Sequence, residues 1–437
     1  MVQFTFMKNF MTRHQRLFGS VIFVLAALFL FFEMALQVSP SIMTNQLMGE
    51  FSINASVLGV MASCYFYSYT AMQIPSGMLY DRFGTRALIS LATAVCSLGA
   101  LCFGFSHSVF LLSVGRFLLG IGSAFAFVGV LSVAAKWFAP SLFALFAGIT
   151  QLLAAVGAMS GALPLAYAVD HFGWRETMIF LGYAGLVLAF LCALIIRDRS
   201  TTPTNGGVAH HHVGFLSSFK EVVCQGQTWS LGLYSFTNWA PALIIPALWG
   251  VPYLMSKYGI PNTSAAFAMS LFWIGGAIIS PCLGWISDKL QRRKILLTVC
   301  TLLGLVASVI LLFATNLSYG VVCALLLCLG CASSGNLLCF AVAKDINRPS
   351  VVSTAMGFNN MAVVLGGAVF QPIVGWILAY LWKGQMINGA PVYSVHTYTI
   401  ALTTVPLCYL IGFIASQFLI KETFCKPKFD VYCDQLQ

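Results

Sequence analysis

The stretch Gly77-Met-Leu-Tyr-Asp81-Arg82-Phe-Gly84-Thr-Arg86 is a short island of charge and glycine between two long apolar runs. The nearest charged residue before it is Glu50, and the next one after it is Arg116. A second island, Gly284-Trp-Ile-Ser-Asp288-Lys289-Leu-Gln-Arg292-Arg293-Lys294, begins 284 − 77 = 207 residues later and repeats the glycine-x-x-x-aspartate-basic spacing. A repeat at nearly half the chain length predicts a protein built from two similar halves.

The spacing within each island has a physical reason. A glycine four residues before the aspartate lets two helices approach closely at a membrane face. The aspartate can lie near a helix N-terminus, where the helix dipole stabilises an anion. The Arg and Lys side chains that follow stay in water on the cytoplasmic side. We therefore expect both islands to be cytoplasmic loops between membrane helices.

Both islands resemble the signature loops of major facilitator superfamily transporters. The loop between the second and third helices of that family is matched by Gly77, Asp81, Arg82, Gly84 and Arg86. Its weaker copy between the eighth and ninth helices is matched by Gly284, Asp288, Lys289 and Arg292. The resemblance implies an all-α membrane protein of twelve transmembrane helices in two six-helix bundles, related by a pseudo-two-fold axis along the membrane normal. It also implies that the two loops form a gate.

The composition independently indicates a polytopic membrane protein. The chain is 59% hydrophobic and 8% charged, with a mean hydropathy of +0.89, which is outside the range of soluble domains. The net charge of +10 would suggest a nucleic-acid partner in a soluble protein, but cytoplasmic loops of membrane proteins accumulate Lys and Arg. We therefore expect a lipid bilayer and no nucleic acid as partner. The fourteen cysteines lack metal-ligand spacing, so we expect neither a metal site nor a disulfide framework.

The apolar runs predict two bundles and a linker. The N-terminal bundle, residues 1–199, has expected spans near 17–39, 55–79, 85–106, 108–133, 141–168 and 175–196. The C-terminal bundle, residues 227–437, has expected spans near 228–256, 262–286, 294–315, 317–343, 351–380 and 396–420. Glycines and prolines predict interruptions in the seventh, eighth and eleventh spans, which contain Pro241, Pro246 and Pro252, Gly275, Gly276 and Pro281, and Gly366, Gly367 and Pro372.

The distribution of basic residues predicts the orientation. Of the 22 Lys and Arg residues, eighteen fall on the side of the two termini and three, Arg175, Lys257 and Lys383, on the opposite side. The remaining one, Arg116, lies inside the membrane. The positive-inside rule therefore predicts that both termini are cytoplasmic. We expect a monomer in a bacterial inner membrane.

Residues 200–226 form the expected cytoplasmic linker. Residues 201–207 have a flexible composition, and His210-His211-His212 follows them. Three adjacent histidines are compatible with metal binding, but no second cluster of ligands accompanies them, so we interpret the segment as a solvated tether. The segment 215–223 has the pattern of a short amphipathic helix on the membrane surface.

Two ionisable side chains, Glu33 and Arg116, stand alone in apolar surroundings within the expected spans. A charge at membrane depth costs roughly 2.5–3.5 kcal/mol even on insertion scales, so each is a functional candidate. At 1.5 Å per residue they lie about 9 and about 12 Å from the same membrane face. Arg116-Phe-Leu-Leu-Gly120-Ile-Gly122 also resembles the fourth-helix arginine motif of the family, which is associated with proton coupling. One hypothesis is a proton switch in which ionised Glu33 pairs with Arg116; the other is a structural pair that fixes helix packing.

The resemblance implies that the first, fourth, seventh and tenth helices line a central cavity. Other polar side chains in the expected spans are compatible either with ligand binding or with bridging between helices. These candidates are Gln37, Tyr65, Tyr69, Gln151, Asn238, Trp239, Asn336 and Asn360. We rank Asn238 and Asn336 first because both fall well inside their spans.

The sequence favours a secondary transporter of a small polar organic solute, coupled to protons. No nucleotide-binding P-loop is present, and no cofactor is expected. Arg116 suits a carboxylate and Glu33 an amine, which favours amino acids or small peptides. The whole chain, including Pro391-Val-Tyr393 and Lys421-Glu422-Thr423, also resembles proteobacterial transporters of the intraphagosomal amino-acid uptake type. The alternatives are proton-driven export of drugs or siderophores and a membrane sensor that binds the solute without moving it. A membrane enzyme is disfavoured because the polar residues at the interfaces are scattered.

Overall fold

The computed structural model describes residues 2–138, 142–198, 215–348, 351–387, 389–426 and 428–429. The linker residues 201–212, including the three histidines, lie outside this description, as do the side chains of residues 2–17 and of Asp81. The N-terminal half contains α1 (Val2–Val38), α2 (Pro40–Glu50), α3 (Ala55–Gly104), α4 (Val109–Ser123), α5 (Ala126–Trp137), α6 (Phe143–Ser160), α7 (Leu163–Phe172) and α8 (Trp174–Ile195).

The C-terminal half has a similar series of helices. It contains α9 (Phe215–Cys224), α10 (Gly226–Ile244), the π-helical turn η2 (Ile245–Trp249), α11 (Gly250–Tyr258), α12 (Asn262–Leu290), α13 (Lys294–Phe313), α14 (Tyr319–Ser333), α15 (Asn336–Ile346), α16 (Val352–Tyr380), β1 (Met386–Ile387), β2 (Ala390–Pro391), α17 (Val395–Leu402), α18 (Thr404–Ile414) and η3 (Ala415–Leu419). The two short strands pair antiparallel, and together they form a hairpin between the last two spans.

The predicted all-α membrane fold is confirmed. In the described part of the chain, eleven helices are long and apolar enough to cross a membrane. The first part of α3, residues 55–83, is a further helix that is rich in Ser and Tyr. Gly84, with φ 79° and ψ 173°, leaves the helical region and separates it from the second part. Because this backbone conformation is accessible mainly to glycine, the chain can reverse here within a single residue.

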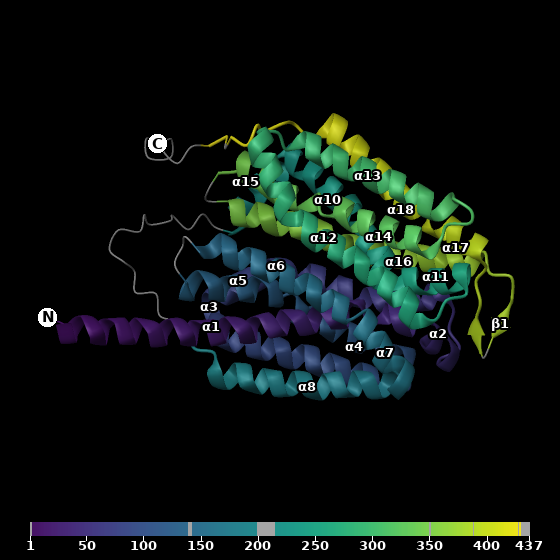
Figure 1. Cartoon of the computed structure of the whole chain (residues 1–437), viewed down its shortest axis with the longest axis horizontal. Helices are drawn as coiled ribbons and strands as arrows, with labels where there is room; N and C mark the ends of the chain where they lie inside the picture. Colours follow the sequence, from purple (N-terminus) through teal and green to yellow (C-terminus); the bar gives the residue numbers. More distant parts are fainter. Residues whose placement is uncertain are drawn as a thin grey trace.

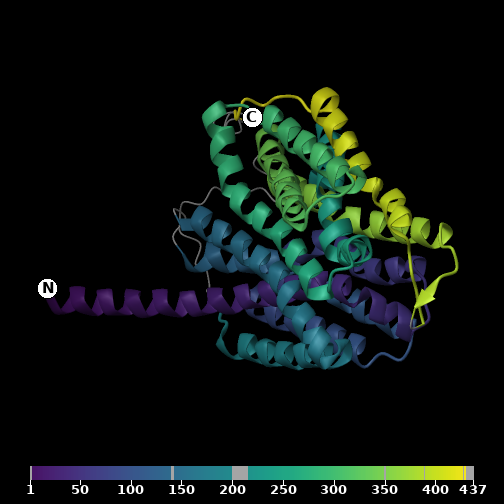
Figure 2. The ribbon, with the colours of Figure 1, turned by 45° about the vertical axis from the view of Figure 1, so that its right-hand side comes forward.

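Both halves pack side by side, as the colours of Figures 1 and 2 show, with the N-terminal half in purple and blue and the C-terminal half in green and yellow. We call the end that carries β1 and β2 the hairpin face. We call the opposite end, which carries the start of α1 and the turn at Gly84, the terminal face. In Figure 1, α1 extends beyond the other helices at the terminal face.

The helix breaks differ in part from the sequence prediction. The expected interruptions of the eighth and eleventh spans are wrong, because α12 and α16 run through Pro281 and Pro372 without a break. Glycines in these helices serve close packing instead: an added Cβ on Gly275 would lie 2.2 Å from the Leu327 carbonyl oxygen. Breaks occur in the fourth and tenth spans, between α4 and α5 and between α14 and α15. The seventh span is interrupted as expected, by η2.

Candidate functional site

Arg116 donates to backbone carbonyls at a break in the first span, where the Ser39 hydroxyl also donates to the Leu36 oxygen at 2.9 Å. Pro40, at the start of α2, has no N–H, so the carbonyl of Leu36 four residues earlier lacks its helical partner. The Nη1 of Arg116 donates to the Leu36 oxygen at 3.0 Å, and its Nη2 donates to the Gln37 oxygen at 3.3 Å. A cation is also favoured here because this is the negative end of the α1 dipole. Arg116 therefore caps the C-terminal end of α1.

Close helix packing brings Arg116 to this position. An added Cβ on Gly120 would lie 2.0 Å from the carbonyl oxygen of Tyr65, so only glycine lets α4 pack this closely on the first part of α3. The Nε of Arg116 donates to the Ala62 oxygen at 3.4 Å, and its guanidinium lies 4.8 Å from the centroid of the Tyr65 ring. With 1% of its surface exposed, the Arg116 side chain is enclosed by backbone and aromatic groups.

Glu33 lies on the other side of Tyr65. Its Oε2 accepts a hydrogen bond from the Tyr65 hydroxyl at 3.1 Å, and Ser123 is a second hydroxyl beside it. Its Oε1 has no hydrogen-bond partner among the described residues, although the side chain is fully buried. Tyr69 stacks on Tyr65 with the ring centroids 5.7 Å apart. Four of the six candidates of the N-terminal half, Glu33, Tyr65, Tyr69 and Arg116, are therefore brought together in one buried cluster.

The hypothesised pair between Glu33 and Arg116 is not formed in this conformation. Among the described residues, no Lys, Arg or His nitrogen lies within 4.0 Å of the Glu33 carboxylate. Tyr65 separates the two groups, because its hydroxyl contacts Glu33 and its ring contacts Arg116. The guanidinium instead donates to the carbonyl oxygens of Leu36, Gln37 and Ala62. Glu33 is thus a buried carboxyl group without a cation.

The highest-ranked asparagines of the C-terminal half form a bridge between helices. The Nδ2 of Asn238, on α10, donates to the Ala332 oxygen at 3.2 Å, and its Oδ1 accepts from the Asn336 N–H at 3.1 Å. Asn238 therefore holds the seventh span against the break between α14 and α15, which is the structural role that the sequence left open. The Oδ1 of Asn336 is buried without a partner among the described residues and is the polar atom of this pair that remains available.

Asn360 is the candidate that connects the two halves. Its Nδ2, on α16, donates to the Oε1 of Gln73, on α3, at 2.6 Å. Trp239 is half-buried and lies edge-on to Trp273, with ring centroids 6.3 Å apart. The two remaining candidates, Gln37 on α1 and Gln151 on α6, are also half-buried.

The first signature loop is held within the N-terminal half by Asp198. The Oδ1 of Asp198 accepts from the Thr85 N–H at 2.5 Å, the Thr85 hydroxyl at 2.7 Å and the Arg86 N–H at 3.2 Å, so it caps the third span. Burial raises the pKa of Asp198, but these hydrogen bonds and the charge of Lys136 outweigh burial and place the pKa below its ordinary value. An added Cβ on Gly84 would lie 2.6 Å from this carboxylate, which explains the glycine.

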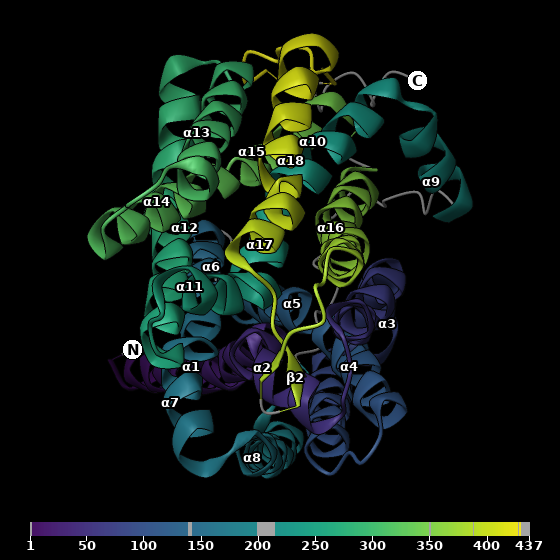
Figure 3. The ribbon, with the colours of Figure 1, turned by 90° about the vertical axis from the view of Figure 1, so that its right-hand side faces the viewer.

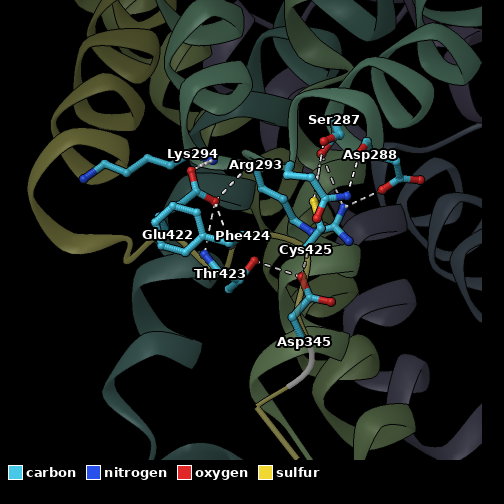
Figure 4. A network of polar contacts seen from close by, with 10 residues as sticks. Ser287, Asp288, Arg293, Lys294, Asp345, Glu422, Thr423, Phe424 and Cys425 are labelled. Atoms are coloured by element: carbon cyan, nitrogen blue, oxygen red, sulfur yellow. Dashed lines mark hydrogen bonds and ion pairs between the residues drawn. The ribbon is translucent and has the colours of Figure 1, made fainter.

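The second signature loop is held in the same way by Glu422, as Figure 4 shows. Its Oε1 accepts from the Arg293 N–H at 2.9 Å and its Oε2 from the Lys294 N–H at 3.0 Å, at the start of α13. The Nε of Arg293 lies 2.6 Å from the Oδ2 of Asp345, and its Nη1 lies 3.7 Å from Asp288. Asp288 thus forms its ion pair within its own half.

The basic residues of both loops likewise make local contacts. Arg82 lies over the neighbouring Phe83 ring, and Lys289 lies over the Trp285 ring at 4.9 Å. The Nε of Arg86 donates to the Ala193 oxygen within the N-terminal half, and Arg292 is exposed. The described contacts of both loops therefore lie within their own halves, and the gate between the loops stays a prediction.

Asp198 and Glu422 were missed from the sequence, although a signal exists. Arg197-Asp198 and Lys421-Glu422 are both basic–acidic pairs directly after the sixth and twelfth apolar runs. The same pair at the end of each half, together with the repeated loops, would have suggested that each half uses its last acidic residue to cap its third helix.

The two faces of the molecule differ in how the halves meet. Near the hairpin face the backbones are in contact: an added Cβ on Gly59 would lie 2.7 Å from the Gln371 oxygen, and one on Gly375 would lie 2.3 Å from the Ala55 oxygen. Near the terminal face, glycines on four helices of both halves have no described atom within 4 Å of an added Cβ. These are Gly77, Gly148, Gly284 and Gly357. The described backbone contacts between the halves therefore lie at the hairpin face, and these four glycines near the terminal face make none.

Two packed helical bundles with charged side chains buried among apolar helices define a polytopic membrane protein. The family model described as Major Facilitator Superfamily matches residues 21–371 and 242–409. The chain belongs to the major facilitator superfamily, as the two signature loops predicted.

Solved and curated relatives agree with this assignment at low identity. The fold is similar to that of a bacterial homologue of the human lysosomal transporter Spinster in an inward-facing, unoccupied conformation, with a TM-score of 0.79, 18% identity, and coverage of 95% of this chain and 99% of that one. The probable galactarate/D-glucarate transporter GudP of Escherichia coli is 22% identical over 82% of this chain and 86% of its own length. The probable sulfoacetate transporter SauU of Cupriavidus necator is 25% identical over 59% of this chain, and the match covers 62% of SauU.

Proposed function

We propose that this protein is a proton-coupled secondary transporter that moves a small polar organic solute by alternating access. The observation that supports proton coupling best is Glu33, a fully buried carboxyl group that accepts a hydrogen bond from Tyr65 and, among the described residues, has no basic nitrogen within 4.0 Å. An ionised carboxylate in such surroundings is costly, so Glu33 carries a proton in this conformation. A group that is neutral in one conformation and ionised in the other moves a proton once per cycle.

Arg116 is the natural partner of Glu33 after it has lost its proton. The guanidinium already lies on the Tyr65 ring whose hydroxyl contacts Glu33. Pairing with the carboxylate would draw Arg116 away from the Leu36 and Gln37 carbonyls and so release the break between α1 and α2. Loss of the proton would in this way change the hydrogen bonds at the start of α2, the helix that reaches the hairpin face.

We further propose that the terminal face is cytoplasmic in a bacterial inner membrane and that the protein acts as a monomer. The support is the excess of Lys and Arg at that face. The open space beside Gly77, Gly148, Gly284 and Gly357 then corresponds to an inward-open conformation, in which the described contacts of the signature loops lie within their own halves.

For the substrate we propose an amino acid or a small peptide. Glu33 and Arg116 offer one acid and one base at similar depth, and the amides of Asn336 and Asn360 supply neutral hydrogen bonds from the opposite half. This proposal requires Arg116 to turn from the Leu36 carbonyl toward the cavity. An organic anion is the second candidate, because the relatives SauU and GudP are named as probable transporters of sulfoacetate and of galactarate/D-glucarate.

The test is a thermal-shift screen of the purified protein against amino acids, dipeptides, sugar acids and sulfonates, followed by uptake of each hit into liposomes. We expect a hit among the first two groups whose uptake rises when the liposome exterior is made acidic. A hit confined to sugar acids or sulfonates would replace the substrate proposal, and uptake that ignores the pH gradient would overturn proton coupling.

A further inference from the structure

The β1–β2 hairpin crosses from the C-terminal half onto the N-terminal half at the hairpin face. Figure 3, viewed from this face, shows β2 passing in front of α2. Gly389, in the turn, has φ 79°, and an added Cβ there would lie 3.5 Å from the Gly49 oxygen at the end of α2. Met386 and Ile387 are 51% and 61% exposed, so the strand β1 buries little of its own surface.

A cavity of about 750 Å³ lies between the hairpin and the two halves. Its walls come from Asn45, Gln46 and Glu50 of the N-terminal half, from Met255 and Ser256 of α11, and from the hairpin itself. The exposed strand β1 therefore lies over open space, whereas β2 packs on α2 and its Pro391 is buried. Few apolar contacts hold β1 in place, so discrete contacts at the ends of the hairpin contribute much of the free energy that fixes it.

Tyr393, directly after the hairpin, makes such a contact between the halves. Its hydroxyl oxygen accepts the N–H of Ala55, the first residue of α3, at 2.8 Å. Its carbonyl oxygen accepts from the Ser256 hydroxyl at 3.2 Å, which ties the same residue to the seventh span. The side chain is 2% exposed and its ring lies edge-on to Tyr398.

The bond to Ala55 completes the cap of a helix in the opposite half. The first N–H groups of a helix lack partners within it. The Asn54 side chain accepts from the Val57 N–H, and Tyr393 supplies the acceptor for Ala55. Because Ala55 is fully buried, its N–H has no ready access to water while the face is closed.

We propose that Tyr393 is a gating residue: its hydroxyl, by capping the α3 N-terminus across the two halves, holds the hairpin face closed. The inference rests on the proposed alternating access, because that mechanism requires the halves to part at this face. When they part, the Tyr393–Ala55 hydrogen bond breaks and the hairpin lifts from α2 above the cavity. The Tyr393–Ala55 hydrogen bond, which we call the latch, stabilises the closed hairpin face, and Tyr393 does not contact the buried Glu33 cluster.

The experiment compares hydrogen–deuterium exchange of the full-length protein and its variants, measured on peptides covering residues 50–60 and 385–395. Tyr393→Phe deletes the hydroxyl and keeps the ring, and we expect both segments to exchange about fivefold faster, the effect of losing one hydrogen bond. Tyr398→Phe is the matched control: Tyr398 lines the same cavity within the C-terminal half, and we expect no change there.

A second variant removes the same bond from the other half. Ala55→Pro deletes the donor at the first helical position, which is compatible with proline, and its ring also takes the place of the hydrogen that faces the Tyr393 hydroxyl. It should accelerate exchange in residues 385–395, and adding Tyr393→Phe to it should cause no further increase. Peptides around Thr85 at the terminal face report that the fold is intact. Unchanged exchange in both single variants would overturn the latch, and because no substrate is needed, this result stands apart from any failure of the transport proposal.

Discussion

Replacing Glu33 by Gln removes the titrating group of the proposed proton pathway and keeps its size. Among the described spans, Glu33 is fully buried without an ion-pair partner, whereas buried Asp345 pairs with Arg293, so our proposal assigns one coupled proton per cycle to Glu33. Each pH unit across the membrane then supplies about 1.4 kcal/mol per proton, which corresponds to about tenfold accumulation of the substrate when the membrane potential is held at zero. In the Glu33→Gln variant this driving force is lost, and the internal substrate concentration should only reach the external one.

The assay is uptake into liposomes under an imposed gradient of one pH unit, beside counterflow without a gradient. Counterflow exchanges substrate and requires no net proton movement, so it should survive in Glu33→Gln and prove that the variant is folded. Glu176→Gln, the same change in a carboxylate at the start of α8, is the control and should accumulate substrate like the parent. Tenfold accumulation by Glu33→Gln would refute the reasoning and assign the proton to another route.

Three further substitutions test other parts of the structure. Arg116→Lys keeps the charge, but one ammonium group cannot reach the carbonyls of Leu36, Gln37 and Ala62 together. We therefore expect a loss of about 2 kcal/mol in the free energy of unfolding, measured by thermal unfolding, and weaker substrate binding, measured by calorimetric titration. Unaltered unfolding would contradict the capping role. Asp198→Asn should lower the melting temperature at neutral pH. Because the pKa of Asp198 is lowered in the fold, the difference in melting temperature from the parent should shrink as the pH falls through that pKa. A difference that is constant with pH would count against the capping role of the Asp198 carboxylate. Gly77→Val should leave the melting temperature unchanged, because no described atom lies within 4 Å of a Cβ added to Gly77. The same change should slow transport by obstructing closure of the terminal face. Normal transport rates would show that Gly77 does not contact the opposite half.

The candidate site could be predicted in its members more than in its connections. Glu33 and Arg116 stand out because a lone charge in an apolar run is expensive wherever the helices pack. Their separation by Tyr65 could not be predicted, because it depends on how α4 packs on α3 at Gly120. The use of Asn238 as a bridge was equally hidden, since an amide in a span has the same sequence signature whether its partner is a ligand or a backbone carbonyl.

The sequence by itself determined the class of protein, the number of spans, the two-fold repeat and the loops at Gly77 and Gly284, because hydropathy, length and repeated spacing are local properties of the chain. Only the tertiary structure decided which face is closed, where Arg116 donates its hydrogen bonds, and that Tyr393 caps a helix in the opposite half 338 residues away. These features depend on the relative placement of two bundles. The free-energy difference between their arrangements is the sum of a few weak contacts between distant residues, and no local pattern records that sum.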